Sequence, residues 1–283
     1  MASREDLVEV FDDTEYWCKH DEKLEAAIMD SITATQFYGE DEKPSIPAKK
    51  FEQTLLSVSK YRSLESAMFY RRKFPDARIC VHNFASATNP GGGVKKGSRA
   101  QEEAICRCST LYPVLNTKEN WSRFYKFHRD RHDAKYTDAC IYTHDILIIK
   151  SDTDVPRRLP EDKWCKVDVI TCAAPNLRER PGNAMNPSPG NQVHLSDKEL
   201  MALHEKRGRH LLAAAAEQKA EIMILGAFGC GAFQNDPKVV AEAYKKILAE
   251  FDGVFREVHF AVYCSPRDTA NYDVFKKVLP VFP

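Results

Sequence analysis

The sequence predicts an α/β fold in which a sheet carries helices on both faces and a helical extension precedes it. After residue 50, short apolar segments with strand character alternate with longer segments of helical periodicity, as in that class. The chain has 283 residues, enough for one large α/β domain with additions and a sizeable core. With 43% hydrophobic and 29% charged residues, its composition excludes disordered, collagen-like and coiled-coil classes.

The first 50 residues predict a helical extension. Apolar residues such as Leu7 and Phe11 recur there at helical spacing among many charged residues. The segment 39–50 follows, polar and with two prolines, so it is expected to be a loop. We therefore expect residues 1–50 to pack as an N-terminal extension on the main domain, residues 51–283.

The main domain is predicted to alternate between strands and helices. Strands are expected at residues 54–58, 78–84, 140–142 with 146–149, 167–173, 221–225 and 257–263. Helices are expected at residues 63–73, 197–219 and 237–251, the last with Pro237 behind a cap at Asn235 or Asp236. The loop 176–192 is rich in proline and glycine and is long enough to be functional or mobile.

Charge, cysteine content and apolar run length bear on the partners and the location of the protein. Lysine plus arginine and aspartate plus glutamate each total 41, so no net field attracts a polyanion and no obligate nucleic-acid partner is expected. Nine cysteines without a charged and then apolar leader favour reduced thiols and a cytoplasmic location. No apolar run approaches the roughly 20 residues of a membrane helix. We expect a monomer that does not associate with membranes.

The stretch NPGGGVKKGSRAQEE, residues 89–103, follows the second expected strand and enters an expected helix at residues 100–111. Ser98 and Gln101 match a capping box, which would place two glutamates in the first helical turn, near the positive end of the helix dipole. One carboxylate could hold a substrate group while the other transfers a proton. The three glycines would let the backbone approach a ligand closely. The alternative is a flexible loop before an ordinary acidic helix start.

A second glycine-rich stretch, LGAFGCGAFQND at residues 225–236, lies between an expected strand and an expected helix. Backbone amides and a helix N-terminus at such a position can bind an anion. The stretch lacks the lysine and Ser/Thr of a Walker A loop and the third glycine of a dinucleotide-binding fingerprint, which disfavours NTPases and Rossmann dehydrogenases. Phe233 could belong to the core or face a ligand, and its spacing does not decide.

Two further groups of residues have simple structural interpretations. A metal could be suggested by Cys106, Cys108, His128, His132 and Cys140, but no CxxC or HExxH spacing is present, so buried thiols and solvated histidines are favoured and no metal is expected. The basic and aromatic segment 121–135 is interpreted as a solvated amphipathic helix, with contact to a polymer or acceptor as the alternative.

Taken together, the two glycine-rich motifs resemble a known family. Asn-Pro-Gly-Gly-Gly, then seven residues, then Gln-Glu-Glu is similar to the signature of poly(ADP-ribose) glycohydrolases, in the context of their microbial-type branch. The later Gly-Cys-Gly-Ala-Phe resembles the diphosphate-binding loop of the same macrodomain fold. The resemblance spans about residues 54–263. It implies a macrodomain-like mixed sheet and an enzyme that needs no cofactor and cleaves the glycosidic bond at C1″ of ADP-ribose.

The resemblance also implies roles for individual residues. Glu103 would be the general acid that protonates the leaving oxygen, and Glu102 would hydrogen-bond the ribose hydroxyls. A neighbouring carboxylate favours the protonated form of the acid. Phe233 would pack on the distal ribose and Tyr263 would stack on adenine. The substrate-binding residues implied are Asn83, Asn89, Gly91, Gly92, Gly93, Gln101, Gly229, Cys230, Gly231, Ala232, Phe233, Asn235 and Tyr263.

The expected function is therefore release of ADP-ribose from poly(ADP-ribose) or from mono-ADP-ribosylated protein or nucleic acid. The alternative is a non-catalytic ADP-ribose reader that binds the ligand with the same loops. The pair of Glu102 and Glu103 favours the enzyme, because a reader needs no acid at the leaving oxygen.

Overall fold

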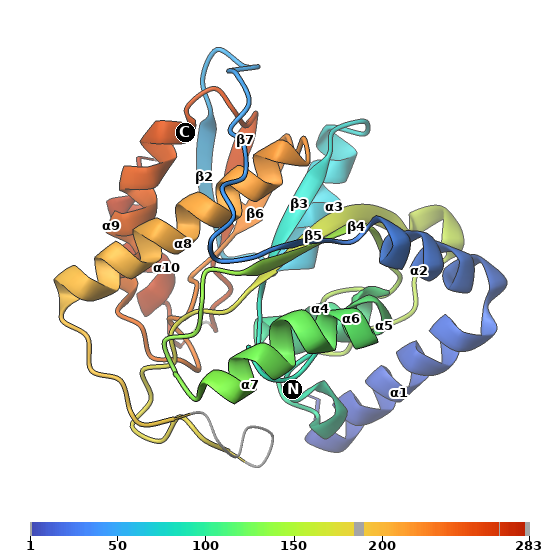
Figure 1. Cartoon of the computed structure of the whole chain (residues 1–283). Coiled ribbons are helices and arrows are strands. Elements are labelled where there is room, and N and C mark those ends of the chain that lie inside the picture. The colour runs from blue at the N-terminus through green and yellow to red at the C-terminus, as the bar shows by residue number, and fades with distance from the viewer. Residues whose placement is uncertain (1, 184–189, 266, 281–283) are drawn as a thin grey trace.

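A computed structural model describes residues 2–183, 190–265 and 267–280 of the chain, and it is built around a seven-stranded mixed sheet (Figure 1). The spatial order of the strands is β1-β4-β5-β3-β6-β7-β2. The strands are β1 (Gln36–Tyr38), β2 (Leu55–Ser59), β3 (Ile79–Phe84), β4 (Cys140–Ile148), β5 (Cys165–Cys172), β6 (Ile222–Leu225) and β7 (Glu257–Ala261).

The sheet is parallel over most of its width. β3 pairs in parallel with β5 and β6, and β6, β7 and β2 continue in the same direction. β4 runs antiparallel to both β5 and β1, with a register shift between Thr143 and Ile146. Six predicted strands are thus confirmed, while the three-residue edge strand β1 was not predicted.

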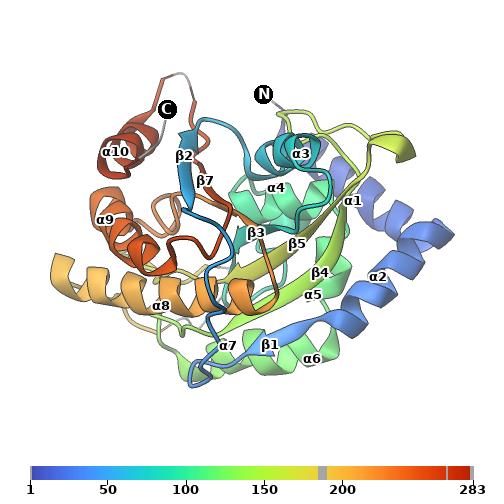
Figure 2. The same cartoon turned by 90° about the horizontal axis from the view of Figure 1, so that it is seen from above.

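Helices cover both faces of the sheet, as the sequence predicts (Figure 2). Ile79 and Val81 of β3 face a core shared with α1–α5, whereas Cys80 faces the core shared with α8–α10. The α-helices are α1 (Arg4–His20), α2 (Glu22–Ala34), α3 (Ser63–Lys73), α4 (Gln101–Cys108), α5 (Leu111–Leu115), α6 (Lys118–Asn120), α7 (Phe127–Arg131), α8 (Asp197–Glu217), α9 (Pro237–Leu248) and α10 (Ala270–Val278). Short 3-10 turns η1 (Val94–Lys96), η3 (Glu161–Lys163) and η4 (Ala249–Phe251) and the π-helical turn η2 (Trp121–Lys126) complete the set.

The predicted helix starts are right at α9 and wrong at α4. Asp236 caps α9 by accepting from the backbone N–H groups of Lys238 and Val239, with Pro237 in the first turn. α4 begins at Gln101 behind Ala100, without a side-chain cap, so Ser98 is not a capping residue.

The Gln101 carboxamide makes tertiary contacts in place of a capping bond. Its Oε1 accepts from the N–H of Phe84 at 2.9 Å, and its Nε2 donates to the Ser63 hydroxyl at 3.0 Å and to the His82 carbonyl at 2.7 Å. α4 also ends at Cys108, before the expected residue 111, because the carbonyl of Cys108 accepts from two N–H groups that follow β4. The start of α4 is therefore tied to the end of β3 by one side chain.

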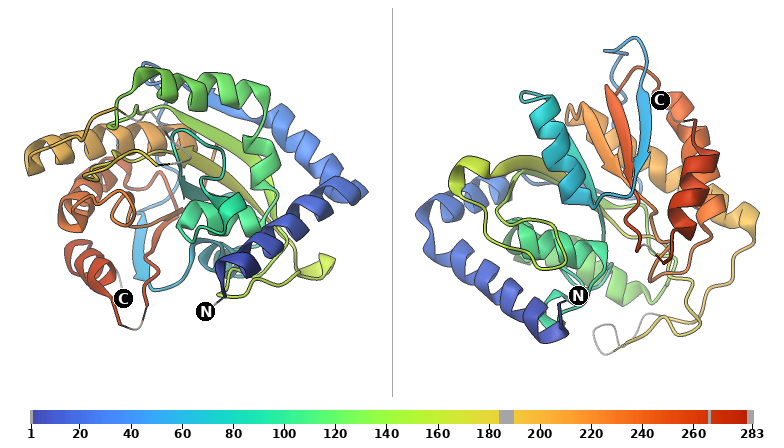
Figure 3. Two further views of the ribbon diagram at one scale, coloured as in Figure 1. Left: turned by 90° about the horizontal axis from the view of Figure 1, so that it is seen from below. Right: turned by 180° about the vertical axis from the view of Figure 1, so that it is seen from behind.

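The N-terminal helix α1 lies beside α4 and η1 (Figure 3). The Thr14 hydroxyl donates to the carbonyl of Arg107 at 2.6 Å, and Gly97 lies directly against the carbonyl of Arg4. Gly97 adopts φ +67°, a left-handed conformation that favours glycine. The loop before α4 is thus held from outside by the extension. The boundary near residue 50 remains a prediction.

Three features of the described part of the chain bear on its class. None of its helices is long and apolar enough to cross a membrane. The nine cysteines are free thiols, and seven of them are buried. Within the described ranges, no three side chains of the metal-ligating types His, Cys, Asp and Glu come together. Residues 184–189 of the predicted 176–192 loop fall outside the described ranges.

Replacing Gly97 with alanine should destabilise the protein, because the new methyl group would meet the backbone of Arg4 and φ +67° is strained for alanine. We expect a loss of about 1–3 kcal/mol in the free energy of unfolding, measured by chemical denaturation. Gly39→Ala is the matched control, because its added methyl group finds no atom nearer than 3.4 Å. Equal stability of both variants would contradict the proposal that close contact with the Arg4 backbone requires glycine at position 97.

Candidate active site

One cavity of about 590 Å³ opens where parallel strands end. Its walls come from the segments that follow β3, β5, β6 and β7, the usual position of a ligand site in a sheet of this kind. The volume lies within the range of small-molecule sites. The sequence-predicted residues that line it are Asn89, Gly92, Gly93, Gln101, Glu102, Glu103, Gly229, Gly231, Ala232, Phe233 and Tyr263.

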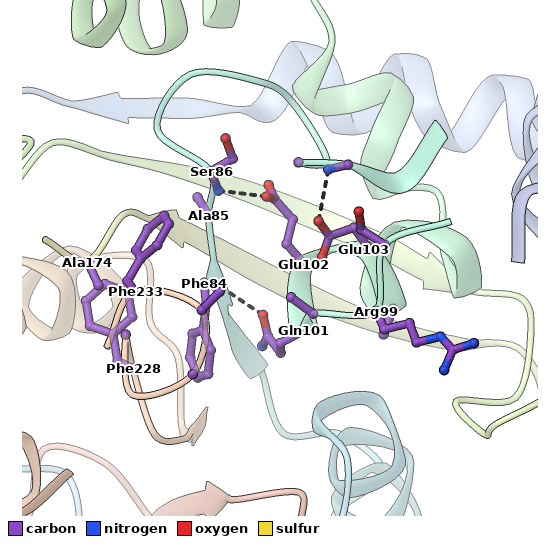
Figure 4. Close-up of a pocket in the computed structure, with 18 of the residues that line it drawn as sticks. Phe84, Ala85, Ser86, Arg99, Gln101, Glu102, Glu103, Ala174, Phe228 and Phe233 are labelled. Atoms are coloured by element: carbon purple, nitrogen blue, oxygen red, sulfur yellow. Dashed lines mark hydrogen bonds between the residues drawn. The ribbon is translucent and has the colours of Figure 1, made fainter. Parts of the chain in front are cut away.

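Glu102 is held from two sides in the first turn of α4 (Figure 4). Its Oε2 accepts from the N–H of Ser86 at 2.7 Å, and its Oε1 accepts from Nδ2 of Asn83 at 3.3 Å. Asn83 also donates to the Thr171 hydroxyl at 3.2 Å. The side chain of Glu102 is only 2% exposed, so the end of β3 fixes this carboxylate from behind.

Glu103 has one bound oxygen and one without a partner. Its Oε1 accepts from the N–H of Gly93 at 2.9 Å. Its Oε2 has no hydrogen-bond partner among the described residues, although the atom is buried and the residue lines the cavity. This oxygen therefore keeps its full capacity to accept or donate a hydrogen bond at the cavity wall.

A side chain at position 92 would not fit beside the two glutamates. A Cβ at this position would lie 2.6 Å from Oε1 of Glu103 and 3.0 Å from Oε2 of Glu102, and φ is +56°. The glycine backbone therefore passes directly over both carboxylates. The close approach seen here is to the protein's own acids, and the approach of the loop to a ligand stays a prediction.

The surroundings of Glu102 favour its protonated form. Burial raises the pKa of Glu102 well above its usual value of 4.5, and the Glu103 carboxylate raises it further, against hydrogen bonds from Ser86, Asn83 and Gly91 that lower it. Within the described ranges, neither carboxylate forms an ion pair. Arg107 is buried nearby, but its guanidinium donates to the carbonyl of Ser98 at 2.6 Å.

The second glycine-rich loop forms the opposite part of the cavity. Figure 4 places Phe228 and Phe233 on one side of Phe84 and the two glutamates on the other. Gly229, Gly231 and Ala232 line the cavity here. Their backbone amides lie where the sequence predicts an anion-binding loop.

Four predicted binding residues lie behind the wall instead of lining it: Asn83, Gly91, Cys230 and Asn235. The Asn235 carboxamide donates to the carbonyls of Pro175, Gly229 and Phe233 and accepts from Nε2 of His204 at 2.7 Å. Burial raises the pKa of the Cys230 thiol, whose sulfur lies 3.6 Å from the Phe228 carbonyl. Asn83 and Asn235 thus hold other residues in place.

Arg62 is a cavity residue that sequence reasoning missed. Its guanidinium stacks on the ring of Tyr263 at 3.9 Å and pairs with Asp154 and, at 3.9 Å, with Asp152. Tyr263 is 51% exposed, and both residues line the cavity. The two positions lie about two hundred residues apart, and no local pattern could connect them.

The segment 121–135 is predicted to be a solvated amphipathic helix, and its residues 121–131 are helical with one buried and one exposed side. Phe124 and Tyr125 are fully buried, and residues 121–126 form a π-helical turn. From this segment, Arg129 stacks on Trp121 and donates to the carbonyl of Thr88 at 2.8 Å and to the side chain of Asn89. The mixture of aromatic and basic residues suggests contact with a polymer or acceptor as an alternative. In the structure, Arg129 from this segment bonds to the loop that follows β3.

The raised pKa of Glu102 predicts a pH-dependent stability. The folded state binds this proton more tightly than the unfolded chain, so the associated stability is present below about pH 4.5 and is lost as pH rises through the higher folded pKa. Glu102→Gln should remove this loss, so its free energy of unfolding should gain on wild type as pH rises from 4.5 to 8. Denaturation at several pH values measures the difference in free energy of unfolding between variant and wild type. For Glu25→Gln, at an exposed site on α2, this difference should not change with pH. A difference that does not change with pH for Glu102→Gln would contradict the raised pKa of Glu102.

Comparison with known proteins agrees with the geometry. Residues 4–151 match the family model of the microbial-type PARG catalytic domain, where PARG stands for poly(ADP-ribose) glycohydrolase. No curated protein sequence matches significantly.

Solved structures extend the similarity over nearly the whole chain. The PARG of Thermomonospora curvata is 26% identical and covers 96% of this chain and 99% of its own, with a TM-score of 0.82. Its complex with the inhibitor ADP-HPD has a TM-score of 0.80 at the same identity and coverage. The PARG of Deinococcus radiodurans in complex with ADP-ribose is 30% identical and covers 88% of this chain and 95% of its own, with a TM-score of 0.73. With the matched catalytic-domain model, these similarities establish that the chain belongs to the microbial-type poly(ADP-ribose) glycohydrolase family.

Proposed function

We propose that this protein hydrolyses the ribose glycosidic bond of ADP-ribosylated substrates, with Glu103 as general acid. The observation that carries the proposal is the asymmetry of Glu103, with one oxygen held by Gly93 and the other without a partner at the cavity wall. A general acid must reach the leaving oxygen with one oxygen while its orientation stays fixed. Membership of the family and the relatives that bind ADP-ribose and ADP-HPD support the same activity.

The proposed step conserves atoms and charge. The bond from C1″ to the leaving oxygen breaks as the proton of Glu103 passes to that oxygen. A water molecule then adds to C1″ and returns a proton to the Glu103 carboxylate. Burial and then the neighbouring Glu103 carboxylate raise the pKa of Glu102, which favours the protonated form of Glu102 before substrate binds.

Positive charge that develops at C1″ needs a negative counterpart. The substrate's own diphosphate, bound to the amides of Gly229 to Ala232, could supply this charge if it folds near C1″. Glu102, held by Ser86 and Asn83, would hydrogen-bond the ribose hydroxyls. Phe233 and Tyr263 both line the cavity, where they would contact the ribose and the adenine.

We also propose where this protein acts, in which oligomeric state, and on which substrates. Nine free thiols, most of them buried, suit a reducing cytoplasm, and we propose that the protein acts there as a monomer. Its substrates would be poly(ADP-ribose) or single ADP-ribose units on protein or nucleic acid. Incubation with labelled poly(ADP-ribose), mono-ADP-ribosylated protein and ADP-ribosylated DNA tests this range. Product from none of the three would favour the non-catalytic reader.

Glu103→Gln should abolish turnover, with kcat at least about 100-fold lower, because the amide cannot protonate the leaving oxygen. The affinity for ADP-ribose should stay within about threefold, because glutamine keeps the size of the side chain and its bond to Gly93. Hydrolysis followed by release of ADP-ribose and calorimetric titration measure the two effects. Glu25→Gln should retain wild-type turnover, and retained hydrolysis in Glu103→Gln would exclude Glu103 as the acid.

Gly92→Ala should also lower kcat by about 100-fold, because its methyl group would displace the two carboxylates by direct contact. Steady-state kinetics on the same substrate measure the loss, with Gly39→Ala as the control for a tolerated alanine. Wild-type kcat in Gly92→Ala would show that the close packing of this loop is not needed for turnover.

A further inference from the structure

Arg107 of α4 is a buried cation to which the proposed reaction gives no role. The residue is only 3% exposed, although a guanidinium stays charged at any pH at which the protein works. Within the described ranges, no carboxylate forms an ion pair with it. Its Nη1 donates to the carbonyl of Ser98 at 2.6 Å, and its buried Nε has no hydrogen-bond partner among the described residues. Burial of a charge without an opposite charge costs stability, so packing alone does not account for Arg107.

The position of Arg107 on α4 directs it toward Glu103. The two residues are four apart, so their side chains lie on the same face of the helix, one turn from each other. A long side chain on a helix points back toward the N-terminus, which brings the guanidinium toward the first turn. Its bond to the carbonyl of Ser98, a residue that precedes α4, agrees with this direction.

The loop before α4 connects the same guanidinium to the Glu103 carboxylate. Ser98 donates its N–H to the carbonyl of Gly93 at 3.2 Å, and Gly93 donates its own N–H to Oε1 of Glu103 at 2.9 Å. With the helical turn from Glu103 to Arg107, these bonds close a ring. The positions of the cation and the acid are therefore set before a ligand enters, so proton transfer needs little reorganisation around them.

Other acidic groups near this guanidinium do not balance its charge. Burial raises the pKa of the thiols of Cys106 and Cys108, so both stay neutral near pH 7. Burial also raises the pKa of Asp152, to about 6. The Asp152 carboxylate has a cation of its own, because the Arg62 guanidinium lies 3.9 Å from its Oδ1.

Glu103 is the acid that remains beside the guanidinium. Burial lowers the pKa of Arg107, and the charges of its neighbours, Glu103 among them, oppose this lowering. The raised pKa of Glu102 favours the neutral form of that side chain. From α1, the uncharged Thr14 hydroxyl donates to the Arg107 carbonyl at 2.6 Å, and Lys95 of η1 is paired with a glutamate of α1 at 3.7 Å. A negative charge on Glu103 would thus be the natural counterpart of Arg107.

We propose that Arg107 is a positioning residue for proton transfer, whose charge stabilises the carboxylate that Glu103 becomes when its proton passes to the leaving oxygen. The inference rests on the proposed function, because it takes Glu103 to be the acid. Before transfer, the acid is neutral and the cation is unbalanced. After transfer, a negative charge stands beside it, and the proton that water returns restores the first state. Arg107 therefore favours the transition state over the ground state.

The test uses two substrates that differ in their leaving group, ADP-ribose that carries either phenol or 4-nitrophenol on C1″. 4-Nitrophenol leaves readily as an anion, whereas phenol depends more on a proton from the acid. Arg107→Gln removes the charge and should lower kcat for the phenyl compound about tenfold, but kcat for the nitrophenyl compound less than about threefold. Both rates are measured on one preparation, so a smaller folded fraction lowers them equally and leaves their ratio unchanged.

Two further variants separate charge from packing. Arg107→Lys keeps a positive charge and should restore much of the rate for the phenyl compound that Arg107→Gln loses. KM should stay within about threefold in both variants, because Arg107 does not line the cavity. Arg157→Gln, at an exposed position outside the cavity wall, should leave both rates as in wild type.

The possible results distinguish the inference from the proposed function. Equal losses for the two substrates in Arg107→Gln, or a lysine variant no more active than the glutamine variant, would overturn the role of the charge. Wild-type rates in Arg107→Gln would overturn it as well and would leave the proposed function in place. A wild-type protein that hydrolyses neither compound nor poly(ADP-ribose) would overturn the proposed function and, with it, the inference.

Discussion

The rest of the site depends on one constraint, the burial of two adjacent carboxylates at a helix start with hydrogen bonds to neutral donors in place of ion pairs. The N–H groups of Ser86 and Gly93 each satisfy one carboxylate, and Asn83 reaches Glu102 from the end of β3. Such burial disfavours ionisation and raises the pKa of Glu102. Oε2 of Glu103 is the carboxylate oxygen of this pair that has no hydrogen-bond partner among the described residues.

Much of the surrounding structure positions those donors. The Gly93 N–H belongs to a loop that α1 holds at Gly97 and that Arg107 holds at the Ser98 carbonyl. Gln101 ties the start of α4 to β3, and Arg129 holds the loop that follows β3. We therefore expect α1 and Arg107 to act on the reaction through the geometry of the backbone, although neither of them lines the cavity.

The sequence predicts the sheet, its main helices and the two glycine-rich loops well, because strand periodicity, glycine and proline act locally. It predicts the Asp236 cap for the same reason. It fails where a side chain has a choice between local and distant partners: Ser98 matches a capping box, but Gln101 bonds to β3. The pairing of Arg62 with Tyr263 is equally invisible, because it depends on strand order. The likeness to a family supplied the roles of the glutamates, which local rules left open.

The most direct test of the central claim is a crystal structure of the Glu103→Gln variant with bound ADP-ribose. We expect the C1″ hydroxyl of ADP-ribose to lie within hydrogen-bonding distance of the residue 103 side chain. We expect the diphosphate to lie against the backbone amides of Gly229 to Ala232. A reversed ligand, with its diphosphate at Lys96 and C1″ away from residue 103, would contradict the central claim.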